Sequence, residues 1–267
     1  MLTETHAHLN DKAFAQDRDA VLARSLERGV TKIIEIACAP DEWGSGEAFC
    51  AARPELLRCA FGVHPEYIKD LKPGYLPELE KYLQKPCAVA LGEIGLDYWW
   101  EPARREEQLA LLAEQLPLCA KYGKPAVYHA RNGKEHGQNA YAELLAVLKA
   151  GWTYSPARKF RGVLHCFSGS WTDASTALGM GLALGVNGTF TYKNNHDLRD
   201  TIRKAGAANI VLETDCPYLP PQSARGKRND PSYIPEIAAM VATHLGLGNN
   251  QLADLTTANA FELFGRF

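Results

Sequence analysis

Short apolar segments alternate with longer amphipathic segments along the whole chain, and this alternation limits the possible folds more than any other feature. The short segments have the length and β-branched composition of buried strands. They span residues 1–5, 31–38, 57–63, 88–94, 126–129, 162–165, 183–186 and 210–214. A strand followed by a helix, repeated eight times in about 250 residues, is what a (β/α)8 barrel requires. We therefore predict an α/β fold, with residues 1–267 forming a single TIM barrel.

The segments between these strands have the pattern of amphipathic helices. Residues 17–29 carry an apolar stripe that ends at Gly29, and residues 105–123 form a longer helix of the same kind. Residues 249–267 are expected to add a last helix on the outside. A doubly wound open sheet is the structural alternative, but no glycine-rich dinucleotide-binding turn follows the first strand.

Composition and cysteine usage indicate a soluble cytoplasmic protein. Hydrophobic residues make up 46% of the chain and charged residues 22%, as in ordinary globular proteins. The seven cysteines are scattered, with no CxxC pair, which favours reduced thiols over disulfides or a zinc ribbon. There is no signal-peptide pattern and no apolar run of membrane-spanning length. The net charge of −2 excludes a general basic coat for nucleic acid, so attraction to a polyanion would have to be local.

Six potential metal ligands lie at or just after the ends of five predicted strands. They are His6, His8, Glu93, His129, His165 and Asp215. The steps from His8 onwards are 85, 36, 36 and 50 residues. At about 31 residues per βα unit, these steps correspond to three, one, one and two units, which together join strand one to strand eight. Active sites of such barrels lie where the strands end, so we expect these side chains to converge on a metal site there.

Each of these residues also has a purely structural interpretation. His129 and His165 could be core histidines, Glu93 an ion-pair partner, and Asp215 a helix cap. Six such residues at one barrel mouth favour ligands instead, and His6 and His8 lie on one strand face. Four imidazoles and two carboxylates exceed the needs of one tetrahedral ion. Two divalent ions that share the carboxylates are the simpler arrangement.

Several longer segments match a known family. They are THAHL at residues 5–9, GVHP at His64, GEIGLDY around Glu93, residues 108–131, VLHCFSG at His165, LETDCPYLP at Asp215, and GKRNDPSYI after it. The sequence resembles the TatD-type metal-dependent deoxyribonucleases, which have amidohydrolase-like barrels, from residue 3 to beyond residue 230. The resemblance implies that the six ligands bind metal and that His64 lies near the scissile phosphate.

This resemblance implies hydrolysis of DNA phosphodiester bonds by an exonuclease that acts on single-stranded or frayed ends. In this hypothesis Asp215 orients or deprotonates the attacking water, Glu93 bridges two ions, and His64 donates to a nonbridging phosphate oxygen. Imidazole ligands favour zinc or manganese at the tighter position, with magnesium or manganese at the weaker one.

Candidate DNA contacts follow three of the strands. Arg225, Lys227 and Arg228 follow the eighth strand, Arg131 follows the fifth, and Trp99 follows the fourth. Basic side chains can neutralise phosphates, and aromatic rings can stack on unpaired bases. The basic segment could equally be a solvated loop, and packing under the loop is favoured for the aromatic triplet 98–100.

Three departures from the family pattern leave substrate choice open. Glu4 stands where an aspartate is usual, Asn132 where an aspartate commonly follows, and residues 150–159 include an insertion. Glu4 is on the same strand face as His6 and is expected to support the site from below.

Two other functions remain as alternatives. The first is an amidohydrolase-like hydrolase of a small amide, ester or lactone. Many such enzymes bridge their metals with a modified lysine on the fourth strand, where this chain has Glu93. The second is a catalytically silent binding or scaffold barrel, which predicts loss of ligands, and none is missing.

Overall fold

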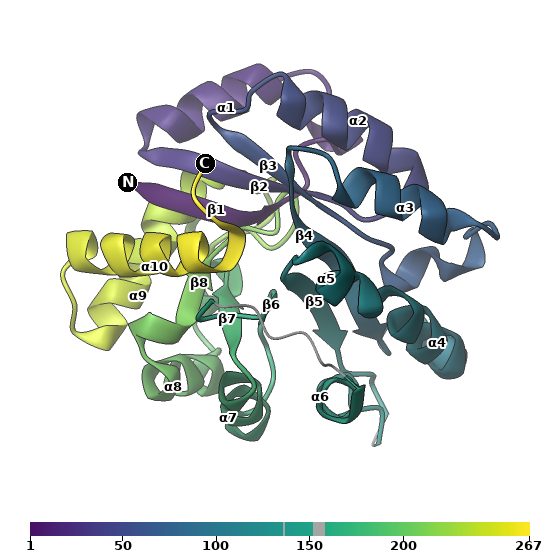
Figure 1. The fold of residues 1–267 in the computed structure, drawn as a ribbon. Helices are drawn as coiled ribbons and strands as arrows, with labels where there is room; N and C mark the ends of the chain where they lie inside the picture. Colours follow the sequence, from purple (N-terminus) through teal and green to yellow (C-terminus); the bar gives the residue numbers. More distant parts are fainter. Residues whose placement is uncertain (136, 152–157) are drawn as a thin grey trace.

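The computed structural model describes residues 1–135, 137–151 and 158–267, and its central feature is an eight-stranded parallel sheet (Figure 1). The strands are β1 (Leu2–Ala7), β2 (Val30–Ala37), β3 (Leu57–Phe61), β4 (Ala88–Asp97), β5 (Ala126–Arg131), β6 (Gly162–Leu164), β7 (Leu182–Val186) and β8 (Ile210–Leu212). Each strand pairs with the next one in the chain. A bridge between Ala7 and Cys216 joins the two outer strands, so the sheet nearly closes. The predicted (β/α)8 barrel is confirmed.

Helices surround the strands on the outside of the barrel (Figure 1). In the described residues they are α1 (Arg18–Glu27), α2 (Pro40–Ala51), α3 (Tyr75–Leu83), α4 (Arg105–Gln115), α5 (Pro117–Tyr122), α6 (Ala140–Gly151), α7 (Trp171–Gly179), α8 (His196–Ala205), α9 (Ile234–Leu245) and α10 (Asn249–Phe264). Helix α10 confirms the predicted last helix and packs against β1 and β8, at the point where the sheet closes. Residues 152–157 of the expected insertion lie outside the described residues.

The single helix predicted over residues 105–123 is wrong in one respect, because the chain forms two helices there. Helix α4 ends at Gln115 and α5 begins at Pro117. Proline has no N–H group to continue the hydrogen-bond ladder, although Leu116 between the two keeps helical angles. Helix α5 then ends at Gly123, which adopts the left-handed φ of +62° that favours glycine.

Three predicted strands end later than the sequence pattern suggested. Strand β1 continues to Ala7 and therefore includes His6. Strand β4 continues past the predicted end to Asp97, and β5 continues to Arg131. The sequence prediction placed the end of each strand where the apolar pattern was interrupted by polar residues. Inside this barrel these polar side chains face the closed interior, and the backbone pairing continues past them.

The barrel interior has an apolar lower part and a polar upper part. One apolar cluster draws residues from seven strands, including Ile34, Val127, Val163 and Val211, and Phe264 of α10 packs against it. Nearer the carboxyl ends of the strands, the interior is filled by buried polar side chains. A larger cluster of apolar residues fills the space between the strands and the helices. The apolar floor therefore places the polar groups at one end of the barrel.

Two observations bear on the cellular setting expected from the sequence. The seven cysteines, all within the described residues, are free thiols. Among the helices in the described part of the chain, none combines the length and apolar character required to cross a bilayer.

Candidate metal centre

A pocket of about 740 Å3 opens at the carboxyl ends of the strands. Five of the six predicted ligands line it, and the sixth, His6, is fully buried beside them. The lining has a strongly acidic character, with six carboxylates and one arginine. These residues are Asp11, Glu35, Glu42, Glu66, Glu93, Asp215 and Arg131. Such a pocket repels a phosphodiester unless cations neutralise it.

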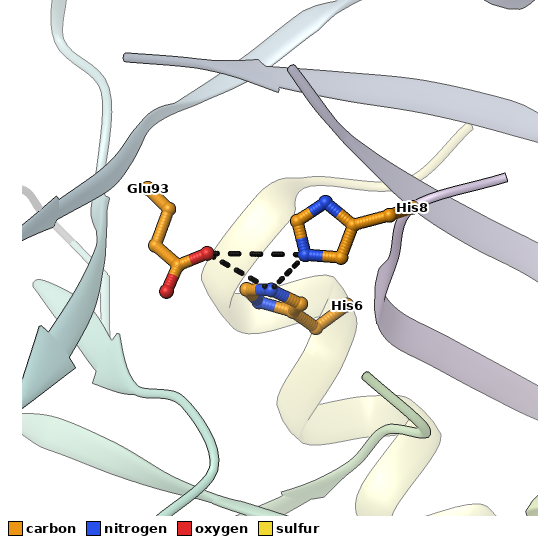
Figure 2. Close-up of side chains that lie close together, drawn as sticks. All are labelled: His6, His8 and Glu93. Atoms are coloured by element: carbon orange, nitrogen blue, oxygen red, sulfur yellow. Dashed lines mark hydrogen bonds and ion pairs between the residues drawn. The ribbon is translucent and has the colours of Figure 1, made fainter. Parts of the chain in front are cut away.

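One group of candidate ligands is formed by His6, His8 and Glu93, whose side chains point toward one another in Figure 2. The two Nε2 atoms of His6 and His8 lie 3.2 Å apart. The Oε2 atom of Glu93 lies 3.3 Å from Nε2 of His6 and 4.0 Å from Nε2 of His8. Two nitrogens bound to one tetrahedral zinc ion are about 3.3 Å apart, so these atoms have nearly the spacing of ligands around a shared ion.

A second group lies around the other oxygen of Glu93. Its Oε1 atom is 2.7 Å from Nδ1 of His129, 2.6 Å from Nε2 of His165 and 3.5 Å from Nε2 of His64. The two carboxylate oxygens of one residue therefore face two different groups of ring nitrogens. A carboxylate in this position can bridge two ions.

Asp215 completes the first group. Its Oδ1 atom lies 3.6 Å from Nε2 of His6 and 3.5 Å from Nε2 of His8. The residue has a left-handed φ of 59°, which is uncommon outside glycine and recurs at functional sites. Its backbone N–H donates to the His6 carbonyl oxygen at 2.9 Å, and this contact fixes Asp215 beside β1.

Burial and neighbouring charges set the protonation of the central groups. Burial alone disfavours a charged Glu93, but the rings of His165, His64 and His6 hold the pKa of Glu93 well below its usual range. Burial, together with His165, lowers the pKa of His6 to about 4. Glu93 and His6 are thus an ionised carboxylate and a neutral imidazole, and these are the forms that bind metal. Burial opposes a charged His8, but Asp215 raises the pKa of His8 to about 9.

His129 is oriented by Asp97, a residue that the sequence prediction did not single out. The Oδ2 atom of Asp97 lies 2.9 Å from Nε2 of His129. Burial opposes a charged ring, but Asp97 and Glu93 together raise the pKa of His129 to about 10. Binding of an ion at Nδ1 would replace the proton on that atom. Asp97 belongs to the GEIGLDY segment, so the signal was present in the sequence.

Glu4 contacts the backbone beside the site and not the histidine rings. Its Oε1 atom accepts the N–H of His6 at 2.8 Å and the N–H of Thr214 at 3.0 Å. The side chain is fully buried, and burial raises the pKa of Glu4 to about 8. One oxygen thereby connects β1, which carries His6, to the segment after β8, which carries Asp215.

Two further buried carboxylates support the site without having been predicted. Glu35 accepts the N–H groups of Leu9 and Asn10, each at 2.9 Å, and so fixes the chain that follows His8. Glu213 accepts the N–H of Cys166 and lies 3.8 Å from Nδ1 of His165. Both follow the rule that ligands are held by a surrounding layer of hydrogen-bonded groups.

The predicted substrate contacts differ in whether they line the metal pocket. Arg131 lines the metal pocket, with its guanidinium 5.1 Å from the Trp99 ring and 5.5 Å from the Trp100 ring. Trp99 itself is half-buried, whereas Trp100, which is not among the predicted contacts, is 59% exposed and lines the pocket.

The three basic residues after β8 also differ in which cavity they line and in whether their charge is paired. Arg225 lines a neighbouring groove. Arg228 forms two hydrogen bonds with the carboxylate of Asp17, so its charge is already paired. Lys227 is exposed and lines neither cavity.

Comparison with known proteins places the chain in a family. The family model described as TatD related DNase matches residues 3–265. A protein of Pantoea vagans named 3'-5' ssDNA/RNA exonuclease TatD is 31% identical over 262 residues, which is 96% of each chain. A protein of Escherichia coli K12 named uncharacterized metal-dependent hydrolase YjjV is 32% identical over 263 residues, 98% of this chain and 96% of the relative.

A solved structure agrees with these sequence matches. The crystal structure of YJJV, a TatD homolog from Escherichia coli, superposes with a TM-score of 0.90 at 30% identity, and the match covers 100% of this chain and 98% of that chain. Because the family model and the full-length relatives match nearly every residue, the protein belongs to the TatD-related DNase family and is one of its metal-dependent hydrolases.

Proposed function

We propose that the protein is a deoxyribonuclease that hydrolyses phosphodiester bonds from single-stranded or frayed DNA ends, acting as one barrel domain over residues 1–267. The observation that supports this most directly is the position of Glu93, whose two oxygens face two separate groups of ring nitrogens. The relative from Pantoea vagans is named as an exonuclease of single-stranded DNA and RNA.

The donor set fits two divalent ions. His6, His8 and Asp215 would hold one ion, His129 and His165 the other, and Glu93 both. The nitrogen-rich donor set favours zinc or manganese at the tighter position, and magnesium or manganese at the weaker. When bound, the ions would supply charge neutralisation for the phosphodiester and a water molecule of lowered pKa.

Asp215 is suited to handle the attacking water. Its carboxylate lines the pocket near His6 and His8. Burial opposes a charged Asp215, but nearby rings, His8 foremost, hold the pKa of Asp215 below its usual value. An ionised carboxylate at this position can orient a water molecule and accept its proton.

His64 is suited to donate a hydrogen bond to the phosphate. Its Nδ1 atom accepts the N–H of Glu66 at 3.2 Å. Burial, together with His129, lowers the pKa of His64 to about 3, so the ring is neutral. The single proton of a neutral ring then resides on Nε2, which faces Glu93 at 3.5 Å in the pocket. This tautomer places a donor where a nonbridging phosphate oxygen would lie.

The enclosed shape of the pocket and the free thiols support the remaining parts of the proposal. A pocket of about 740 Å3 accommodates a strand end better than a long duplex. Seven free thiols fit the reducing conditions of the cytoplasm.

The test is a time course on single strands labelled at the 3' or the 5' end, with zinc, manganese or magnesium. We expect a ladder that begins at one end for the wild type and at least a hundredfold slower cleavage for Glu93→Gln. Equal cleavage by the two proteins would show contamination. Failure with every ion, together with turnover of a lactone or amide, would support the small-molecule alternative. DNA and metal binding without any turnover would support the silent barrel.

A further inference from the structure

A second cavity of about 490 Å3 lies next to the metal pocket. The two cavities share Tyr192 and Asn195 in their walls, so they are adjacent. The remaining lining comes from the segment between β7 and α8 and from the segment that follows β8. The groove residues are Tyr192, Lys193, Asn194, Asn195, Gln222 and Arg225.

The charge of this groove is opposite to that of the metal pocket. Lys193 and Arg225 line it, and no carboxylate does. Within the described ranges 1–135, 137–151 and 158–267, neither cation forms an ion pair with a carboxylate. By contrast, the metal pocket has six carboxylates in its lining. An anion is therefore attracted to the groove by protein charges alone, without a metal ion.

Hydrogen bonds hold the groove walls in place. The hydroxyl of Tyr192 donates to the Pro220 carbonyl oxygen at 3.0 Å, and the N–H of Gln222 donates to Oγ1 of Thr191 at 2.7 Å. The segments also approach so closely that a Cβ atom on Gly188 would lie 2.3 Å from the Leu219 carbonyl oxygen. These contacts connect the two segments, so the groove is largely formed before any ligand binds.

The Tyr192 ring, which is part of the groove wall, orients Arg225 for contact with an anion. Its guanidinium carbon lies 4.5 Å from the centre of the Tyr192 ring. Stacking on an aromatic ring leaves the N–H groups at the edge of the guanidinium available for phosphate oxygens. Arg228 lacks this freedom because Asp17 already occupies its N–H groups.

We propose that this groove binds the phosphate next to the scissile one, with Arg225 as the principal contact, so that the enzyme recognises at least two consecutive phosphates of a strand. This inference deepens the proposed function and rests on it for the identity of the ligand. Lys193 adds a second positive charge at the same place.

Binding without turnover gives the first test. Fluorescence anisotropy of labelled hexathymidylate is measured in EDTA over a range of salt concentrations, for the wild type, Arg225→Ala and Arg225→Lys. We expect Arg225→Ala to bind about tenfold more weakly and its salt slope to fall by about 0.7, the value for one single-strand phosphate contact. Arg225→Lys keeps the charge and should recover the slope, although it cannot reproduce the stacked guanidinium.

Kinetics in the presence of metal give the second test. Bis(4-nitrophenyl) phosphate has one phosphate and can reach only the metal pocket. We expect Arg225→Ala to raise KM for the oligonucleotide about tenfold with kcat within twofold of wild type, and to leave the small diester unaffected.

Lys204→Ala is the matched control. It removes the same charge from α8, where the ammonium lies over the Trp171 ring and lines neither cavity. Equal weakening by Lys204→Ala would reduce the effect to general electrostatics and overturn the inference. Unchanged binding by Arg225→Ala would do the same, as would an unchanged KM of that variant for the oligonucleotide. If Arg225→Ala weakens binding but the wild type cleaves no DNA, the groove is still a phosphate-binding site, and the proposed function is wrong.

Discussion

The Nε2 atom of His129 lies 2.9 Å from the Oδ2 atom of Asp97, and this contact decides which ring nitrogen faces the metal pocket. With Nε2 donating to Asp97, Nδ1 is directed at Glu93 and His165 and can act as a ligand. Metal-binding histidines usually donate their second N–H to a carboxylate or carbonyl in this way.

Asp97→Asn should therefore lower kcat by about 10- to 100-fold and weaken metal binding by a similar factor. The other oxygen of Asp97 accepts the N–H groups of Trp99 and Trp100, and the amide oxygen of asparagine can keep those bonds. Its NH2 group would then donate to Nε2 and force the ring proton onto Nδ1, the ligand atom. Kinetics and metal titration measure both effects. Asp173→Asn, at the start of α7, is the control and should change neither.

Removal of metal should lower the melting temperature. An ion at a hundredfold excess over its Kd stabilises the folded state by about 2.7 kcal/mol, which corresponds to about 5 to 10 °C for a chain of this size. Differential scanning fluorimetry before and after EDTA, and after zinc or manganese is restored, measures the shift. Glu93→Gln should show at most half of it. An identical shift in that variant would place the bound ion elsewhere.

Gly95→Ala should destabilise the barrel by about 3 kcal/mol or more. Gly95 has a φ of +149°, and a Cβ atom there would lie 2.0 Å from the His129 carbonyl oxygen. The matched control is Gly44→Ala in the interior of α2, where the added Cβ has only an ordinary contact at 3.5 Å. That change should raise stability by about 0.5 to 1 kcal/mol. Urea unfolding of the two variants should thus give shifts of opposite sign.

The Asp17 and Arg228 pair should stabilise the loop after β8 in a pH-dependent manner. Hydrogen bonds from Arg228 hold the pKa of Asp17 below its ordinary value of 3.8. A depressed pKa means that the contribution is present above pH 3.8 and is lost as the pH falls through the lower folded-state pKa. A double-mutant cycle of Asp17→Ala and Arg228→Ala, read as melting temperature, should show coupling at pH 7 and less at pH 3. Additive effects at pH 7 would contradict the pairing.

The sequence was informative about the barrel because each strand carries its own local pattern. All eight strand predictions fall on observed strands. The expected ligands lie together because they are at or near the carboxyl ends of strands, which converge at one end of the barrel. Pro117 was visible in the sequence, yet the helix pattern around it was continuous, so the break between α4 and α5 was missed.

Other features depend on contacts between distant segments and could not be read locally. Arg225, Lys227 and Arg228 look alike in sequence, but Arg225 lies over the Tyr192 ring whereas Arg228 is paired with Asp17. Trp99 and Trp100 are neighbours and both rings lie near Arg131, yet Trp99 is half-buried and Trp100 is 59% exposed. Their role in binding substrate stays a prediction.

The seam between β1 and β8 has a consequence for how the protein is made. Glu4 and Thr214 are joined by a hydrogen bond across 210 positions of the chain, and His6 and Asp215 lie beside them. At about 5 to 20 residues per second, synthesis separates His6 from Asp215 by roughly 10 to 40 s. A growing chain that already displays THAHL on the ribosome still lacks Asp215 for all of that interval. The full set of candidate ligands can therefore assemble only late, when the segment after β8 pairs with β1 and the barrel closes.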